Sequence, residues 1–299
     1  MNFRRLFLLV LFAFIFLVPA TRLSAKEVRV LQAEEVTVSF DPPLESTARE
    51  IVRNYPLIKA DLEGMFGWNL MFRPTILLVK ERKEFLRSAP NPLTVAFAVP
   101  RRNLIVIDYA TAISRPFSLE DILKHELCHL LIHAHIRHPM LPRWLDEGVC
   151  QWASGGIGDI IMNQKRSFLN RAALRGRFIP LKHLADRFPY EKESHVLAYE
   201  ESKAIVVYII SKYGREKFLN VLGKMKNGEP VESAVFQTLS VSITELEKDW
   251  HRSLEKGVTW LAYLSYHLYE ILFVLTAMVT VYAFIKMIRK KRAYSDEEI

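Results

Sequence analysis

The pattern of hydrophobic and polar positions divides the chain into a strand-rich first third and a helical remainder. Short runs rich in β-branched residues predict strands at 28–40, 75–79, 94–99 and 104–109. Between the first two, apolar residues at helical spacing predict a helix from Ile51 to Met65, with Pro56 as a kink or break. From residue 118 onward helical spacing dominates, and the last four helices are expected at 202–212, 216–226, 231–239 and 243–256. The fold class predicted is α+β, with a small mixed or antiparallel N-terminal sheet and a mainly helical C-terminal lobe.

One helix is specified in more detail than the others. Ser118 and Asp121 form a capping box, and Phe117 can pack on Ile122 as a hydrophobic staple. Apolar residues then recur at helical spacing, and Pro139 ends the run. We therefore expect a buried helix from about 119 to 135.

This helix carries the pentad His125-Glu126-Leu127-Cys128-His129, which has the H-E-x-x-H spacing of zinc peptidases. Positions i and i+4 lie on one helical face, so the two imidazoles can bind one metal ion. Glu126, about 100° round the helix from His125, can reach a water on that ion. Three polar groups on a buried helix are costly unless they bind something. The pentad therefore predicts one zinc ion, with Glu126 as general base.

Zinc in a peptidase needs a third protein ligand, and two later histidines are poor candidates. His133 lies about 12 Å from His125 along the helix axis, too far to share one ion. His135 completes a metzincin spacing, but Ile132 stands where that family has glycine. A β-branched residue is unsuited to the positive φ that the glycine supplies.

Glu147 is the preferred third ligand, 18 residues after His129. Pro142 suits the first turn of a helix, and the stretch 144–153 could be helical before Gly155-Gly156 stops it. A second helix packed on the first would bring one carboxylate to the metal. Asp146 is the rival, but it would point about 100° away from Glu147.

The pentad followed by Pro142-x-Trp144-x-x-Glu147-Gly148 resembles the gluzincin peptidases, and more closely the bacterial peptidase MA-like domains. Downstream runs at 197–202, 207–210, 213–214 and 242–250 fit the same family, so that the resemblance covers most of residues 26–255. It implies zinc ligation by His125, His129 and Glu147, Glu126 as the base, and Tyr199 near the reacting carbonyl. Cys128 departs from the small or apolar residue usual in the pentad, but removes no ligand.

Other roles in the site have competing candidates. Tyr199 is the first choice for a donor to the oxyanion and His195 the second. The metal-binding imidazoles need partners for their other ring nitrogens, and the candidates are Asp121, Asp146 and Gln151.

In gluzincins a strand before the metal helix borders the cleft and can pair with an extended peptide; Leu104–Asp108 is the strand expected here. Cys128 and Cys150 either form a disulfide between the two ligand helices or are two buried thiols.

The N-terminus has the layout of a signal peptide, predicted to span residues 1–25. Arg4-Arg5 precede an apolar core of 13 residues, Leu6 to Val18, and Ala20 and Ala25 offer cleavage points. The core is short for a membrane span, so an uncleaved anchor is the lesser alternative.

A second hydrophobic segment lies near the C-terminus. Ile271–Ile288 would be about 27 Å long as a helix, enough to cross a bilayer. The basic run 289–292 after it fits the cytoplasmic side of a membrane. The aromatic residues before it fit a membrane interface: Trp260, Tyr263, Tyr266 and Tyr269. We therefore expect an extracytoplasmic domain at 26–257, a juxtamembrane and transmembrane segment at 258–288, and a cytoplasmic basic tail at 289–299. The alternative is a buried C-terminal helix.

Net charge excludes one class of partner. The whole chain carries +8, but residues 26–257 contain 33 Lys and Arg against 29 Asp and Glu, or +4. Such a modest excess does not predict nucleic-acid binding.

The sequence predicts a zinc metallopeptidase held in the cell membrane by one span, with a peptide or protein substrate on the periplasmic or extracellular side. The alternative is a non-catalytic envelope binding or structural domain that retains the fold.

Overall fold

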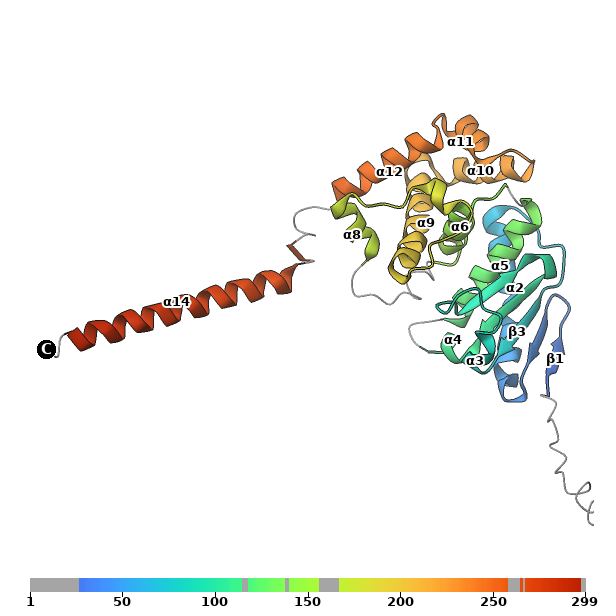
Figure 1. Cartoon of the computed structure of the whole chain (residues 1–299). Coiled ribbons are helices and arrows are strands. Elements are labelled where there is room, and N and C mark those ends of the chain that lie inside the picture. The colour runs from blue at the N-terminus through green and yellow to red at the C-terminus, as the bar shows by residue number, and fades with distance from the viewer. Residues whose placement is uncertain are drawn as a thin grey trace, which may run out of the picture.

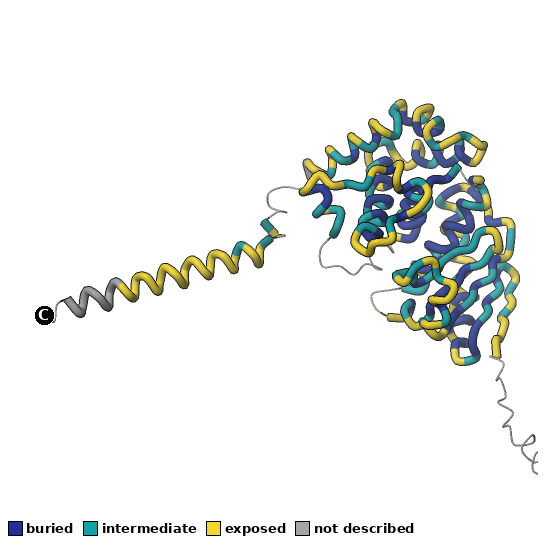
Figure 2. The backbone as a smooth tube through the Cα atoms, in the orientation of Figure 1, coloured by how far each residue is buried: buried dark blue, intermediate teal, exposed yellow. Residues whose placement is uncertain are grey.

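The computed structural model describes residues 27–114, 118–137, 140–155, 167–257, 264–265 and 267–296; of these, 256–257 and 289–296 are described by backbone alone. The predicted signal peptide, Phe117, Pro139 and the first three aromatic residues of the predicted interface lie outside the described residues. Figure 1 shows a sheet with helices packed on it, a helical lobe beside it, and one long helix that projects from this body. Figure 2 shows buried residues in both parts, and one hydrophobic core includes residues of the sheet and of the helical lobe.

The sheet is mixed, as predicted. Its strands are β1 (Arg29–Gln32), β2 (Thr37–Phe40), β3 (Thr75–Val79), β4 (Ala96–Val99) and β5 (Leu104–Asp108), in the order β1-β2-β3-β5-β4. The central pairs β2–β3 and β3–β5 are parallel, and the two outer pairs are antiparallel.

Two strand predictions were wrong. The segment 28–40 is a hairpin of two strands and not one strand, because Glu34 and Glu35 occupy a tight turn in which Ala33 N–H donates to Val36 O. Leu104–Asp108 is not the cleft-bordering edge strand either. The turn at Pro100–Arg102, closed by Asn103 at φ 50°, folds β4 back onto β5, so that β4 becomes the edge.

Two long helices cover the sheet. Helix α2 (Glu45–Phe66) buries Ile51, Tyr55 and Leu62, and Gly67 ends it at φ 67°. It continues through Pro56, which lies on its exposed side, and the proline does not break it. Helix α5 spans Leu119–His135, as predicted, and Ser118 Oγ accepts a hydrogen bond from Asp121 N–H at its start.

The C-terminal lobe is helical, as predicted. Its main helices are α6 (Arg143–Ala153), α8 (Phe168–Arg175), α9 (Lys192–Tyr213), α10 (Arg215–Lys226), α11 (Val231–Leu239) and α12 (Ile243–Gly257). Helix α9 begins ten residues before the predicted start at 202, because the Glu191 carboxylate caps it by accepting from Glu193 N–H and Ser194 N–H. In α6, a Cβ on Gly148 would lie 2.1 Å from Ser202 O, so the two helices touch through backbone at this glycine.

The projecting helix is α14 (Leu268–Asp296). Among the described residues it alone is long and apolar enough to cross a membrane: Leu268–Ile288 has a mean hydropathy of 2.2 and no part of it is buried. An exposed apolar face of this length is compatible with a single membrane span and not with the buried C-terminal helix that was the alternative.

Candidate metal centre

Three side chains from α5 and α6 converge in the interior. His125 and His129, one turn apart on α5, bring their Nε2 atoms to 3.2 Å. Glu147 of α6 places Oε2 3.7 Å from His125 Nε2 and 3.6 Å from His129 Nε2. All three residues are at most 9% exposed. The structure thus brings together the three residues that the sequence singled out.

The spacing of these atoms fits a tetrahedral zinc ion. Ligand atoms bonded at roughly 2.0–2.1 Å to such an ion lie about 3.4 Å apart, close to the three distances in this group. Glu147 Oε2 is also buried with no hydrogen-bond partner among the described residues. A buried carboxylate oxygen without a donor is costly, and a bound cation would satisfy it.

The other oxygen of Glu147 is held in place by two neighbours. Oε1 accepts hydrogen bonds from Arg143 at 3.2 Å and from the Tyr199 hydroxyl at 3.3 Å. Burial alone would raise the pKa of Glu147, but contacts with His125, His129 and Arg143 hold it well below its usual value. The carboxylate is therefore ionised and oriented.

Both histidines have partners for their second ring nitrogen. Asp146 Oδ1 lies 2.8 Å from His129 Nδ1, and its other oxygen lies 2.9 Å from His133 Nε2. Burial opposes ionisation of Asp146, but the two histidines lower its pKa below the ordinary value. Asp146, one of three sequence candidates, therefore orients His129, while Gln151 instead donates to Tyr199 O.

The partner of His125 could not be found from the sequence. Ser154 Oγ lies 3.5 Å from His125 Nδ1 and donates its own proton to Cys150 O at 2.8 Å, which leaves its lone pairs toward the ring. Ser154 follows the last residue of α6. Nothing in its local sequence marks it, because its proximity to α5 depends on how the two helices pack.

Glu126 faces the cleft beside these residues. It is 6% exposed, and burial raises its pKa above the usual value, partly offset by the nearby histidines and by a hydrogen bond from the Ala98 backbone. The cleft has a volume of about 710 Å³ and is lined by β4, the loop 88–95, and parts of α5, α6 and α9. A carboxylate in such a place is a stronger base than an exposed one.

Strand β4, and not Leu104–Asp108, borders this cleft. Asp108 N–H donates to Val95 O, so the backbone groups of Val95 and of every second residue after it point toward β5. Backbone groups alternate in direction along such a strand, so those of Ala96 and Ala98 point away from β5. The hydrogen bond from the Ala98 backbone to Glu126 agrees with this outward direction.

The remaining histidine and tyrosine candidates lie in different surroundings. Tyr199 lines the cleft, and burial raises the pKa of its hydroxyl, which therefore keeps its proton. His195 also lines the cleft, but its Nε2 is engaged with Asn91. His135 contacts Leu131 O and stacks on Trp68, outside the three-residue group. His133 contacts Asp146 and none of the three.

A disulfide joins Cys128 of α5 to Cys150 of α6, with Cα atoms 5.4 Å apart. Both cysteines are fully buried. The sequence left this bridge as one of two alternatives, because the separation of two helices cannot be derived from spacing along the chain. The bridge fixes the distance between the two helices that carry the converging side chains.

One comparison with known proteins identifies a family. A family model of the Peptidase MA superfamily matches residues 89–256. No curated protein matches the chain.

Three solved structures illustrate the similarity. Yeast LTA4 hydrolase with bestatin is 14% identical over 71% of this chain and 36% of its own, with a TM-score of 0.44. An M1 zinc metallopeptidase from Deinococcus radiodurans is 17% identical over 77% of this chain and 51% of its own, with a TM-score of 0.43. Legionella pneumophila aminopeptidase A is 15% identical over 75% of this chain and 27% of its own, with a TM-score of 0.44.

The chain spans only about a third to a half of the length of the first solved structures that it matches. The family match, in contrast, covers more than half of the chain and contains every residue of the three-residue group. The chain therefore belongs to the Peptidase MA superfamily, as its resemblance to gluzincin peptidases implied.

Proposed function

We propose that the chain is a zinc-dependent metallopeptidase that hydrolyses peptide bonds, with one zinc ion held by His125, His129 and Glu147. The observation that carries this proposal is the spacing of the three ligand atoms at 3.2 to 3.7 Å, with Glu147 Oε2 lacking any other described partner. Two imidazoles and one carboxylate are the donor set of many zinc peptidases.

When bound, zinc supplies two things: it lowers the pKa of a coordinated water to about 7, and it polarises a carbonyl. Glu126 accepts the proton of the attacking water and delivers it to the leaving amine. Its burial supports this role, because the raised pKa lets the carboxyl carry a proton between the two events. Asp146 and Ser154 keep the two imidazoles in the required orientation.

Tyr199 is the proposed donor to the oxyanion. Its hydroxyl keeps its proton and lies 3.3 Å from Glu147 Oε1, so it sits at the edge of the three-residue group. A small rotation would let it donate to a substrate oxygen instead. His195 is less suited, because its ring nitrogens already contact Pro189 O and Asn91.

An extended peptide can bind along the free edge of β4. The outward backbone groups of Ala96 and Ala98 offer a donor and acceptors to a peptide added as a further strand. This edge lines the same cleft as Glu126 and the three ligands. Main-chain pairing of this kind recognises peptides as a class, independently of their side chains.

The proposed location is the outer side of the cell membrane. In this proposal residues 1–25 are a signal peptide, 26–257 the extracytoplasmic peptidase domain, 258–288 the juxtamembrane and transmembrane segment, and 289–299 a cytoplasmic tail. The exposed apolar surface of α14 and the disulfide, a bond typical of oxidising compartments, both support it.

The test compares three variants of the full chain, purified in detergent, by metal analysis and by mass spectrometry of an unstructured peptide mixture. Glu126→Gln is expected to keep one zinc but lose about 100- to 10,000-fold in cleavage rate. Glu147→Ala is expected to lose zinc, whereas His135→Ala, the matched control on the metal helix, retains it. Zinc binding without cleavage in the wild type would favour a non-catalytic binding domain. Absence of zinc from the wild type would sink the proposal.

A further inference from the structure

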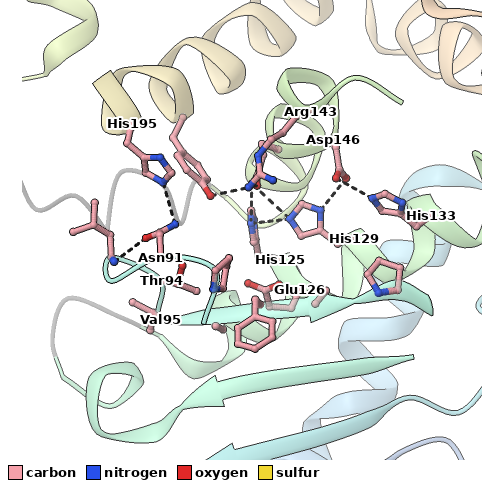
Figure 3. A pocket seen from close by; sticks show the side chains of 18 of the residues that line it. Asn91, Thr94, Val95, His125, Glu126, His129, His133, Arg143, Asp146 and His195 are labelled. Atoms are coloured by element: carbon pink, nitrogen blue, oxygen red, sulfur yellow. Dashed lines mark hydrogen bonds and ion pairs between the residues drawn. The ribbon is translucent and has the colours of Figure 1, made fainter. Parts of the chain in front are cut away.

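The loop 88–95 touches helix α9 across the cleft. Asn91 Nδ2 lies 3.3 Å from His195 Nε2, although the residues are 104 positions apart in the sequence (Figure 3). Both line the cleft that contains Glu126 and the three proposed ligands. We refer to this interaction as the Asn91–His195 contact.

The direction of the hydrogen bond follows from the surroundings. Pro189 O lies 2.8 Å from His195 Nδ1 and can only accept, so Nδ1 carries the hydrogen. In a neutral ring Nε2 is then the acceptor, and the Asn91 amide donates to it. Asn91 Oδ1 in turn accepts from Leu93 N–H at 2.8 Å. Both ends of the Asn91 side chain are thus engaged.

The loop is anchored from the sheet side as well. Arg82 donates to Thr94 O at 2.6 Å, to Pro92 O at 2.5 Å and to the fully buried Asp108 Oδ2 at 2.7 Å. These bonds fix the backbone on the C-terminal side of Asn91. Asn91 is therefore presented to α9 by a loop that has its own support on the sheet side.

The contact lies at one end of the cleft. In Figure 3, Asn91 and His195 stand on one side of the labelled residues and His133 on the other, with His125, Glu126 and His129 between them. A peptide paired with β4 and passing Glu126 would meet the Asn91 and His195 side chains where they join. At the opposite end, His133 bonds to Asp146 of α6, and among the described residues no hydrogen bond joins β4 to α6 or α9 there.

We propose that the Asn91–His195 contact closes one end of the cleft and limits how far a substrate extends beyond the cleaved bond on that side. The inference rests on the proposed peptidase function and defines its substrate class: peptides with a short portion on the closed side and a longer one on the open side. A longer peptide has to break the hydrogen bond between Asn91 and His195 before it fits.

The experiment uses the full chain with a ladder of peptides that share one cleaved sequence and are lengthened by polar residues at either the N- or the C-terminus. The wild type is expected to lose kcat/KM as one terminus grows and not as the other grows. Asn91→Ala is expected to raise kcat/KM for the lengthened peptides by about three- to tenfold relative to the shortest, the effect of one neutral hydrogen bond. His195→Ala, which removes the contact from the other side, should shift the same ratio.

Asn170→Ala on the exposed surface of α8 is the matched control, and thermal unfolding shows whether each variant is folded. A structural role alone would change stability, but would leave the ratio of long to short peptides untouched. Equal ratios in wild type and both variants, within a factor of two, would overturn the inference. The affinity of the same peptides for Glu126→Gln, alone and combined with Asn91→Ala, gives a second readout without turnover. A wild type that neither binds nor cuts any peptide contradicts the proposed function itself.

Discussion

Cys128 and Cys150 link the two helices that carry the proposed zinc ligands, with Cα atoms 5.4 Å apart. Cys128 immediately precedes His129, and Cys150 lies three residues after Glu147, about one helical turn. The bond therefore fixes α5 against α6 at the level of the ligands. It holds the three side chains near one another whether or not a cation is bound, which reduces the reorganisation that metal binding requires.

Removing the disulfide is expected to destabilise the fold. The bridge closes a loop of sequence separation 22, for which chain entropy gives about 3 kcal/mol. The variant Cys128→Ala/Cys150→Ala should lose roughly that much free energy of unfolding, measured in urea by tryptophan fluorescence without metal. Adding a reductant should lower the unfolding free energy of the wild type towards that of the variant, and should leave the value of the variant unchanged. Equal stabilities of the oxidised wild type and the variant would contradict this.

Asp146 is expected to tune metal affinity without binding the ion. It holds His129 Nδ1 at 2.8 Å and is kept ionised by His129 and His133. Asp146→Asn retains an acceptor but loses the charge, so zinc affinity should fall by about 10- to 100-fold, the usual cost of losing such a partner. Competition with a chromogenic chelator measures it. Asp186→Asn, in the same cleft, is the control, and an equal loss in both variants would rule out a specific role for Asp146.

The local parts of this architecture could be predicted from the sequence. Helix α5 and its pentad depend on a capping box and on i, i+4 spacing, both of which are local, and the observed bounds Leu119–His135 agree. The proximity of Glu147 to the two histidines was expected from a second predicted helix packed on the first and from the family resemblance. The exposed apolar helix α14 likewise reflects composition alone.

The parts that could not be predicted depend on how distant segments meet. Whether β4 or β5 forms the edge is decided by the turn at Pro100–Arg102, which folds β4 back on the outside. The early start of α9 depends on one Glu191 carboxylate, a residue type that is not among the strongest helix caps. Ser154 and Asn91 reach the site only through tertiary packing, so no spacing along the chain marks them.

Gly148 is required by the packing of α6 on α9. A Cβ there would lie 2.1 Å from Ser202 O and 2.8 Å from Val206 Cγ2, so Gly148→Ala must push the helices apart. We expect a loss of about 1–3 kcal/mol in unfolding free energy, with weaker zinc binding because Glu147 is adjacent. A Cβ on Gly223 in α10 would meet nothing within 4 Å, so Gly223→Ala should raise the unfolding free energy by up to about 1 kcal/mol. Denaturant unfolding of the two variants decides, and a neutral Gly148→Ala would disprove the close contact.

Glu201 is expected to make the fold less stable as the pH rises. It is fully buried in α9, where burial and the charges of Glu247 and Glu200 raise its pKa from 4.5 to about 8, although Ile179 N–H donates to it. The folded chain therefore holds a proton that the unfolded chain releases above about pH 4.5, so the free energy of unfolding falls between these two values. Glu201→Gln keeps an acceptor for Ile179 but has no proton to lose. Unfolding in urea at pH 5, 6.5 and 8 measures the free energy of both proteins. The difference, variant minus wild type, should increase by about 1–3 kcal/mol from pH 5 to pH 8. A constant difference between the two proteins at all three pH values would show that Glu201 is ionised in the folded chain, and that its buried Oε2 has found a partner that the described residues do not provide.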